Sequence, residues 1–164
     1  MAIRTIIKYP QDEATLRKIS KAVDVFDERL GVLLDDLRDT MYKAKGAGLS
    51  AIQVGVLKRV CVVDTGKRYL EFINPVIVKQ SGVNKIVEEG CLSLPGEWGE
   101  VIRPNKVEVE FFDRFGVPQK NTYIGYEAKA ICHECDHLDG ILFIDRMQEQ
   151  QAAKTQQKKD KKRK

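Results

Sequence analysis

Two histidines four residues apart, His133 and His137, are the residues best suited to chemistry, and they are the only histidines in the chain. On a helix this spacing places both imidazoles on one face, where they can bind a single metal ion. Glu134 would then lie beside the ion, where a glutamate can accept a proton from a water that the metal activates. The H-E-x-x-H pattern therefore favours a metallohydrolase. On this motif alone, the alternative is a helix with two partly exposed histidines.

The residues around the motif support a helix. Residues 126–130 are mostly good helix formers that lead into it, and Gly140 follows it as a residue suited to a left-handed helix stop. The motif is therefore expected to form one face of a short helix that ends before Gly140.

The four cysteines offer a rival metal site. Cys132 and Cys135 could join Cys61 and Cys91 in a four-thiolate structural zinc site. At about 100° per residue, however, the Cys132/Cys135 pair points roughly 150° away from the two histidines, so the two pairs cannot bind one ion. Because Cys132 and Cys135 share their side of the helix with apolar residues, we predict that both are buried packing residues.

A third ligand is needed to complete the histidine site. The elongated H-E-x-x-H-x-x-G-x-x-H pattern fails, because Phe143 occupies the position of its last histidine. Of the acidic residues that follow, Asp145, Glu149 and Asp160, two lie in a polar tail. Cys91 is the best upstream candidate, since it lies where a strand-like run meets a turn rich in Gly and Pro.

Three segments together resemble the signature motifs of the peptide deformylase family. They are GAGLSAIQ at 46–53, EGCLSLP at 89–95 and HECDHLDG at 133–140, and the resemblance extends from about Ile3 to Met147. It implies a metal-dependent hydrolase that removes the formyl group from N-formylmethionyl nascent polypeptides and releases formate. The chain departs from the family pattern at Ser50, where alanine is frequent, at Cys132, where glutamine is usual, and at Ala47, which is smaller than the usual aliphatic residue.

The resemblance also implies a set of site residues. The metal ligands would be Cys91, His133 and His137, and Glu134 would move the proton. The Gln53 amide and the backbone N–H of Leu92 would stabilise the oxyanion. The substrate peptide would bind along the main chain near Gly46, Ala47, Gly48, Glu89 and Gly90.

A ligand set of one cysteine and two histidines leaves a fourth position open for water, which is typical of a catalytic rather than a structural site. Such a set is compatible with zinc, ferrous iron, cobalt or nickel. The resemblance implies one Fe(II) per chain, with zinc, nickel or cobalt able to replace it in a purified sample.

The sequence indicates which elements must position these residues. Asp24 is the predicted N-cap of a helix that runs to about Lys43, with an apolar stripe along one side. Short β-branched or alternating runs at 60–63, 70–73, 76–78, 86–87, 106–111 and 119–123 predict strands, joined by connections too short for helices. The expected architecture is α+β, with antiparallel sheets packed around the metal-binding helix, and the resemblance implies the same fold.

Bulk composition fits one catalytic domain over residues 1–147. The chain has 164 residues, of which 43% are hydrophobic and 32% are charged, as is usual for a globular protein. The longest apolar runs are too short to span a bilayer, and the first residues resemble neither a signal nor a transit peptide. Four cysteines without a regular framework suit a reducing compartment. We therefore expect a cytoplasmic, bacterial-type monomer without membrane contact.

The last residues, Gln148 to Lys164, form a basic tail. Seven Lys and Arg residues outnumber Glu149 and Asp160 there, so the tail carries a net +5 and the rest of the chain is near −1. The tail is predicted to be a flexible extension, with a polyanion contact as the alternative. Some deformylases dock on the ribosome through a C-terminal extension, so Lys154 to Lys164 is a candidate contact for ribosomal RNA.

Three other classes fit only part of the sequence. A zinc endopeptidase lacks its downstream ligand, a noncatalytic metal module gives Glu134 no role, and an RNA-binding adaptor would depend on the tail alone.

Overall fold

The computed structural model describes residues 2–163. Its elements in chain order are α1 (Glu13–Leu16), α2 (Glu28–Lys43), β1 (Gly48–Ser50), the 3₁₀ helix η1 (Ala51–Val54), β2 (Val60–Asp64), β3 (Tyr69–Ser81), β4 (Lys85–Cys91), β5 (Leu94–Arg103), β6 (Lys106–Phe112), β7 (Pro118–Ile124), α3 (Gly125–Leu138) and α4 (Phe143–Lys162). All strand pairs are antiparallel. They form a five-stranded sheet in the order β1-β2-β3-β6-β7 and a separate β4–β5 hairpin. The predicted α+β architecture is confirmed.

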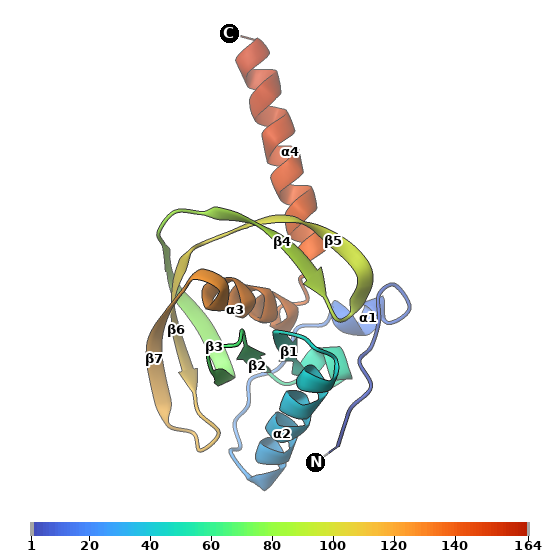
Figure 1. Ribbon diagram of the computed structural model, residues 1–164, viewed down its shortest axis with the longest axis vertical. Helices are drawn as coiled ribbons and strands as arrows, with labels where there is room; N and C mark the ends of the chain where they lie inside the picture. Colours follow the sequence, from blue (N-terminus) through green and yellow to red (C-terminus); the bar gives the residue numbers. More distant parts are fainter. Residues whose placement is uncertain (1, 164) are drawn as a thin grey trace.

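Helix α3 lies between the five-stranded sheet and the β4–β5 hairpin (Figure 1). Its Ala128, Ile131 and Leu138 join a buried cluster with Phe72 and Val109 of the sheet. Gly140 follows the helix with a φ of +73°, as its predicted role in the helix stop requires. The central position of α3 therefore comes from burial of one apolar face against the sheet.

Strand β2 is buried on both faces, which explains its continuous run of apolar residues. Successive side chains of a strand point to opposite faces. Val60 and Val62 pack in the cluster formed with α2, whereas Cys61 and Val63 pack in the cluster formed with α3. The sheet thus separates two cores, and α2 covers the face opposite to α3.

Two element boundaries differ from the sequence expectation. Helix α2 begins at Glu28, because the carboxylate of Asp27, not that of Asp24, accepts a hydrogen bond from the Leu30 N–H at 3.1 Å. The two expected strands at 70–73 and 76–78 are one strand, β3, in which Asn74 has a φ of +52° and the register shifts between Ile73 and Val76.

Strand β5 was absent from the sequence expectation. Its residues Gly96, Gly99 and Pro95 are poor strand formers, so the segment lacks the pattern that identifies a strand. The β4–β5 pairing runs from Lys85↔Arg103 to Cys91↔Leu94, and it brings Cys91 to the end of the hairpin.

The predicted flexible tail is helical in the structure. Helix α4 continues to Lys162, and its distal turns are exposed and project from the body (Figure 1). The tail is rich in Gln, Lys and Ala, which are good helix formers, and Gln156 donates to Asp160 at 2.9 Å one turn later. The charge and low hydropathy of the tail are typical of a flexible segment, although its residue types favour a helix. Lys164, the end of the predicted tail, lies outside the described residues.

Within residues 2–163, no helix combines the length and apolar character needed to cross a membrane.

Candidate active site

Three side chains bring potential metal-binding atoms to one point. His137 Nε2 lies 3.2 Å from His133 Nε2 and 3.2 Å from Cys91 Sγ, and the three ligand atoms lie within 4.8 Å of one another. A tetrahedral ion with usual bond lengths to nitrogen and sulfur needs donors about 3.3–3.7 Å apart. Among the described residues, this is the one group of three His, Cys, Asp or Glu side chains so arranged. The set fits a divalent ion.

Glu89 orients His133 within this group. Its carboxylate contacts His133 Nδ1, so Nδ1 carries a proton and Nε2 is the nitrogen available to a metal ion. Arg103 holds the same carboxylate through two hydrogen bonds of 2.9 and 2.7 Å. Burial opposes ionisation of Glu89, but the bonds from His133 and Arg103 prevail and lower its pKa to about 2. Glu89 was expected at the substrate. It lines the cavity described below, but its carboxylate is bonded to His133 and Arg103.

The two imidazoles differ in their affinity for protons. Burial lowers the pKa of His137 and keeps it neutral, which is the form that binds metal. Burial acts in the same direction on His133, but its hydrogen bonds to Cys91 and Glu89 raise its pKa above the usual value. An ion at this site therefore competes with a proton, and its binding should release one.

Glu134 is buried beside these side chains, and two residues of β1 fix its carboxylate. Ser50 Oγ lies 2.6 Å from Glu134 Oε2, and a Cβ added to Gly48 would lie 2.5 Å from Oε1. Burial raises the pKa of Glu134, although the neighbouring His133 and the hydrogen bond from Ser50 both counteract that rise. A carboxylate with a raised pKa next to a metal site is suited to general acid–base chemistry.

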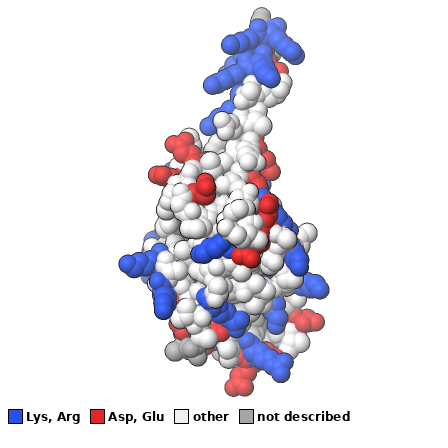
Figure 2. Space-filling model, turned by 90° about the vertical axis from the view of Figure 1, so that its right-hand side faces the viewer, with Lys and Arg blue, Asp and Glu red and all other residues white. Residues whose placement is uncertain are grey.

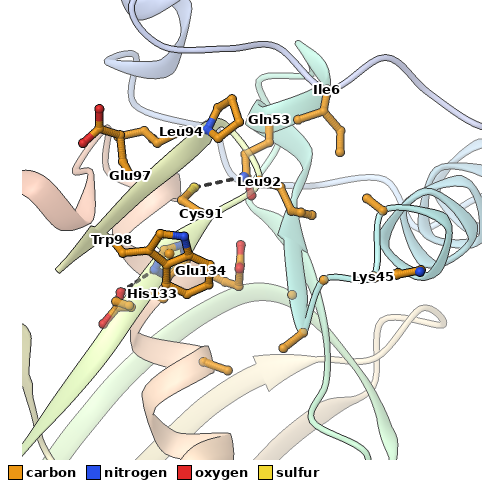
Figure 3. A pocket seen from close by; sticks show the side chains of 18 of the residues that line it. Ile6, Lys45, Gln53, Cys91, Leu92, Leu94, Glu97, Trp98, His133 and Glu134 are labelled. Atoms are coloured by element: carbon orange, nitrogen blue, oxygen red, sulfur yellow. Dashed lines mark hydrogen bonds and ion pairs between the residues drawn. The ribbon is translucent and has the colours of Figure 1, made fainter. Parts of the chain in front are cut away.

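Gln53 approaches the site from η1. Its side-chain oxygen accepts a hydrogen bond from the Ser50 N–H at 2.9 Å. Its Nε2 therefore points the other way, 3.1 Å from Ser93 Oγ and 3.5 Å from Cys91 Sγ (Figure 3). The amide donors of Gln53 thus face the same point as the metal ligands.

The site opens into a cavity of about 580 Å³. All of the predicted substrate-binding residues line it, as do Gln53, Leu92, Cys91, His133 and Glu134. The exposed Trp98 lies across Gly90, where a Cβ would come within 2.7 Å of its ring (Figure 3). His137 is only 1% exposed and lies on the buried side. An elongated substrate can therefore reach the ligands from one side only.

Known proteins are similar to this chain in sequence and in structure. The sequence model of the family described as "Polypeptide deformylase" matches residues 3–153. A curated peptide deformylase of Acetivibrio thermocellus is 56% identical over 149 residues, which are 90% of this chain and 85% of that protein. The chain belongs to the peptide deformylase family. It is therefore a metal-dependent hydrolase that removes the N-terminal formyl group from formyl-methionyl nascent polypeptides and releases formate.

Solved deformylase structures have the same fold. The enzyme from Legionella pneumophila has a TM-score of 0.83 and 42% identity and covers 99% of both chains. A structure described as the Met-Ala-Ser bound class I type b enzyme from Acinetobacter baumannii has a TM-score of 0.83 and 31% identity, and it covers 88% of this chain and 98% of that one.

The cysteines of α3 pack in the core of this deformylase, as predicted. Cys132 and Cys135 are 5% and 8% exposed and belong to the cluster that contains Cys61 and Phe72. Burial raises the pKa of Cys132 to about 11, and it also raises those of Cys61 and Cys135 well above the usual value. These thiols are therefore protonated, and the rival four-thiolate site does not form.

Sequence reasoning missed several residues of the deformylase site. Arg103 lies at the end of a strand with no recognisable pattern, and its role depends on the pairing of β4 with β5. Ser93 follows Cys91 in a recognised motif, but its contact with Gln53 crosses from one element to another. In the sequence, Ser50 stands out only as a departure from the family pattern, and its hydroxyl is the one signal of a contact with Glu134. These contacts join residues that are far apart in the sequence, and neither hydrophobic periodicity nor composition predicts them.

Proposed function

We propose that Cys91, His133 and His137 hold one divalent ion in this deformylase and that Glu134 moves the proton of the reaction. The convergence of the two Nε2 atoms and the Cys91 Sγ next to the buried Glu134 carboxylate supports this assignment. The lone pair of His133 is directed by Glu89, which supports a ligand role for that imidazole.

The chemistry follows from the positions of these groups. A bound divalent ion supplies a Lewis acid that makes water nucleophilic near neutral pH. Glu134 takes the proton from the attacking water and delivers it to the departing amine of the substrate. Gln53 Nε2 donates a hydrogen bond to the formyl oxygen as negative charge develops there, and the backbone N–H of Leu92 is proposed as a second donor. Gln53 is pre-oriented for this by its bond to the Ser50 N–H.

The substrate peptide is proposed to bind beside β1. That strand pairs with β2 on one side and ends the sheet order, so its other edge is available for an added strand next to the cavity. Residues Gly46, Ala47 and Gly48 line the cavity, and Glu89 and Gly90 line its opposite wall from β4. The Met-Ala-Ser peptide of the Acinetobacter baumannii structure is the kind of product this groove would release.

Fe(II) is the proposed ion in the cell. The sequence resemblance implies it, and a set of one thiolate and two imidazoles accepts Fe(II) as well as zinc, nickel or cobalt. Metal analysis of protein purified without oxygen checks this. About one iron per chain is expected, and zinc or nickel alone in such a sample would contradict it.

The first test compares the wild type with Glu134→Ala in formate release from formyl-Met-Ala-Ser. The variant should keep its ion, because all three ligands remain, and its kcat should fall by about 10²- to 10⁴-fold. Unchanged turnover in the variant would remove Glu134 from the mechanism. Loss of the ion in the variant would show that Glu134 is a ligand instead.

The basic end of α4 is proposed to contact ribosomal RNA. Figure 2 shows Lys and Arg side chains gathered at the free end of this helix, where Lys158, Lys159, Lys161, Lys162 and Arg163 are exposed. The proposed contact spans Lys154–Lys164. Because its substrates are nascent chains, we propose that the enzyme acts in the cytoplasm and as a monomer.

Co-sedimentation with ribosomes tests the tail. Replacement of Lys158, Lys159, Lys161 and Lys162 by Gln should weaken binding and reduce its dependence on salt, since each phosphate contact adds to that dependence. Equal binding by both proteins across a range of salt would contradict the contact.

A further inference from the structure

The first turns of α4 are joined to the β4–β5 hairpin. Gln150 brackets one residue of β5, because its Oε1 accepts a hydrogen bond from the Ile102 N–H at 2.9 Å and its Nε2 donates to the Ile102 carbonyl at 3.1 Å. Met147 of α4 lies against Gly99 of β5. The two are so close that a Cβ added to Gly99 would clash with the Met147 side chain. The hairpin that carries Cys91 and Glu89 is therefore held from its outer side by the last helix.

A second connection runs from α4 to α3 through charges. Arg146 makes a two-pronged contact with Asp136, with Nη2–Oδ1 and Nε–Oδ2 distances of 2.9 and 3.1 Å. Asp136 Oδ2 also accepts a hydrogen bond from Arg103 Nη1 at 2.7 Å. Asp136 directly precedes the ligand His137 in the chain.

The same Arg103 completes a path to the other histidine. Its Nε and Nη2 hold Glu89, and the Glu89 carboxylate contacts His133 Nδ1. Opposite charges therefore alternate from Arg146 through Asp136, Arg103 and Glu89 to a metal ligand. The Arg103, Asp136 and Glu89 side chains are only 5%, 13% and 12% exposed, so their mutual contacts replace water.

The balance of charge explains why Arg146 matters. With Arg146 present, two guanidinium groups form ion pairs with the two largely buried carboxylates, Asp136 and Glu89, and Arg146 also pairs with the exposed Glu149 at 3.5 Å. Without Arg146, the buried Arg103 would be the one guanidinium group paired with both Asp136 and Glu89. Asp136 would then draw Arg103 away from Glu89, and Glu89 would hold His133 less firmly. The Asp136 side chain is only 13% exposed, so water can replace a lost cationic partner only in part.

We propose that Arg146 and Gln150 are positioning residues of the metal centre. Gln150 fixes the hairpin that supplies Cys91, and Arg146 keeps Arg103 and Glu89 set against His133. The first turns of α4 thus help to position the active-site residues, whereas its exposed end does not contact them. The proposal rests on the ligand set proposed above.

The test follows retention of Co(II), a probe whose thiolate charge-transfer band reports the cysteine ligand directly. The variants are Arg146→Gln and Gln150→Ala. Their matched controls are Arg29→Gln, which removes the same charge from the exposed side of α2, and Gln151→Ala, which makes the same truncation on the exposed side of α4. Arg146→Lys retains the charge without the two-pronged contact, and it serves as the second variant if Arg146→Gln does not fold.

Loss of Co(II) to a chelator should be about three- to tenfold faster in Arg146→Gln and Gln150→Ala than in their controls, below the effect usual for direct partners of a ligand. The kcat for formyl-Met-Ala-Ser should fall by a similar factor while KM changes little, and Arg146→Lys should lie between Arg146→Gln and wild type. An altered charge-transfer band in the folded variants would support the proposal further.

Two results would contradict different claims. Variants that melt at a lower temperature but keep Co(II), its spectrum and kcat like their controls would show that α4 only stabilises the fold, and the proposal would be overturned. A His137→Ala variant that binds Co(II) with the wild-type spectrum would instead contradict the ligand set on which the proposal rests.

Discussion

The two faces of α3 carry similar potential metal ligands but have opposite surroundings. His133 and His137 meet Cys91 of the hairpin, and a carboxylate orients His133 from outside. Cys132 and Cys135, one residue before His133 and two before His137, lie among apolar side chains of the sheet. Polar partners surround one face and a hydrocarbon core surrounds the other.

The difference indicates that surroundings, more than residue type, decide which side chains are suited to bind metal. A thiol becomes a ligand as a thiolate, and burial among apolar groups raises the pKa of Cys132 and Cys135 and keeps both protonated. An imidazole binds metal in its neutral form, and a carboxylate on its other nitrogen selects the lone pair that faces the ion. The side of α3 on which a residue lies therefore decides whether it contributes to the candidate metal site or to the apolar core.

Among changes that leave Glu134 and the proposed ligands in place, the largest expected effect comes from adding one methyl group to β1, opposite the polar face of α3. Gly48→Ala would place Cβ 2.5 Å from Glu134 Oε1, and the buried carboxylate would have to move. Because a shift of about 1 Å can reduce a rate by about a hundredfold, kcat for formyl-Met-Ala-Ser should fall about ten- to a hundredfold. The metal content should stay at the wild-type value, since no ligand is touched.

Gly31→Ala is the matched control for this change. Gly31 lies in α2, where the nearest atom to an added Cβ is Arg114 Nη1 at 3.8 Å, and the substitution should leave kcat unchanged. A Gly48→Ala enzyme with wild-type turnover would show that the position of the Glu134 carboxylate is not critical.

A change on the apolar face should affect stability instead of chemistry. Cys135→Ala removes a buried sulfur from the cluster around Phe72, and the cavity should cost about 1 kcal/mol of the free energy of unfolding. For a chain of this size the melting temperature should fall by about 2–4 °C. Formate release per folded enzyme and metal content should equal those of the wild type. Loss of the ion would show that the two faces are not independent.

The sequence predicted this division well, because it follows from local geometry. A helix with ligands four residues apart has a defined face, and Cys132 and Cys135 had to point elsewhere. The family motifs added Cys91, whose approach to the histidines depends on the fold and which the structure brings within 3.2 Å of His137. The central helix and the antiparallel strands were also predicted, since they have clear hydrophobic periodicity.

Features that depend on pairing between distant segments could not be predicted in this way. Arg103 reaches Glu89 only because β5 pairs with β4. The glycines of β5 remove the residue pattern by which a strand is recognised in a sequence. The start of α2 depended on which of two aspartates caps it, and both Asp24 and Asp27 are good N-caps by type. The helical tail is not evident from the sequence, because its charge and low hydropathy are typical of a flexible extension although Gln, Lys and Ala favour a helix.

The smallest expected effect concerns Ser50, which joins the polar face of α3 to β1. Its hydroxyl lies 2.6 Å from the Glu134 carboxylate, and this hydrogen bond favours the ionised form and lowers the pKa of Glu134. Ser50→Ala should therefore raise that pKa. Since Glu134 must be ionised to accept a proton, the acidic limb of the kcat/KM profile should move to higher pH.

The loss in kcat/KM at neutral pH should be small, about two- to threefold, because the higher pKa that lowers the ionised fraction of Glu134 also makes its carboxylate a stronger base. The profile is measured with formyl-Met-Ala-Ser for wild type, Ser50→Ala and Ser20→Ala, which removes another buried hydroxyl outside the site. A limb that stays in place in Ser50→Ala, or one that moves equally in Ser20→Ala, would mean that the Ser50 hydroxyl does not tune Glu134. A shift confined to Ser50→Ala would show that the proton affinity of the α3 base is set in part from β1, across the boundary between helix and sheet.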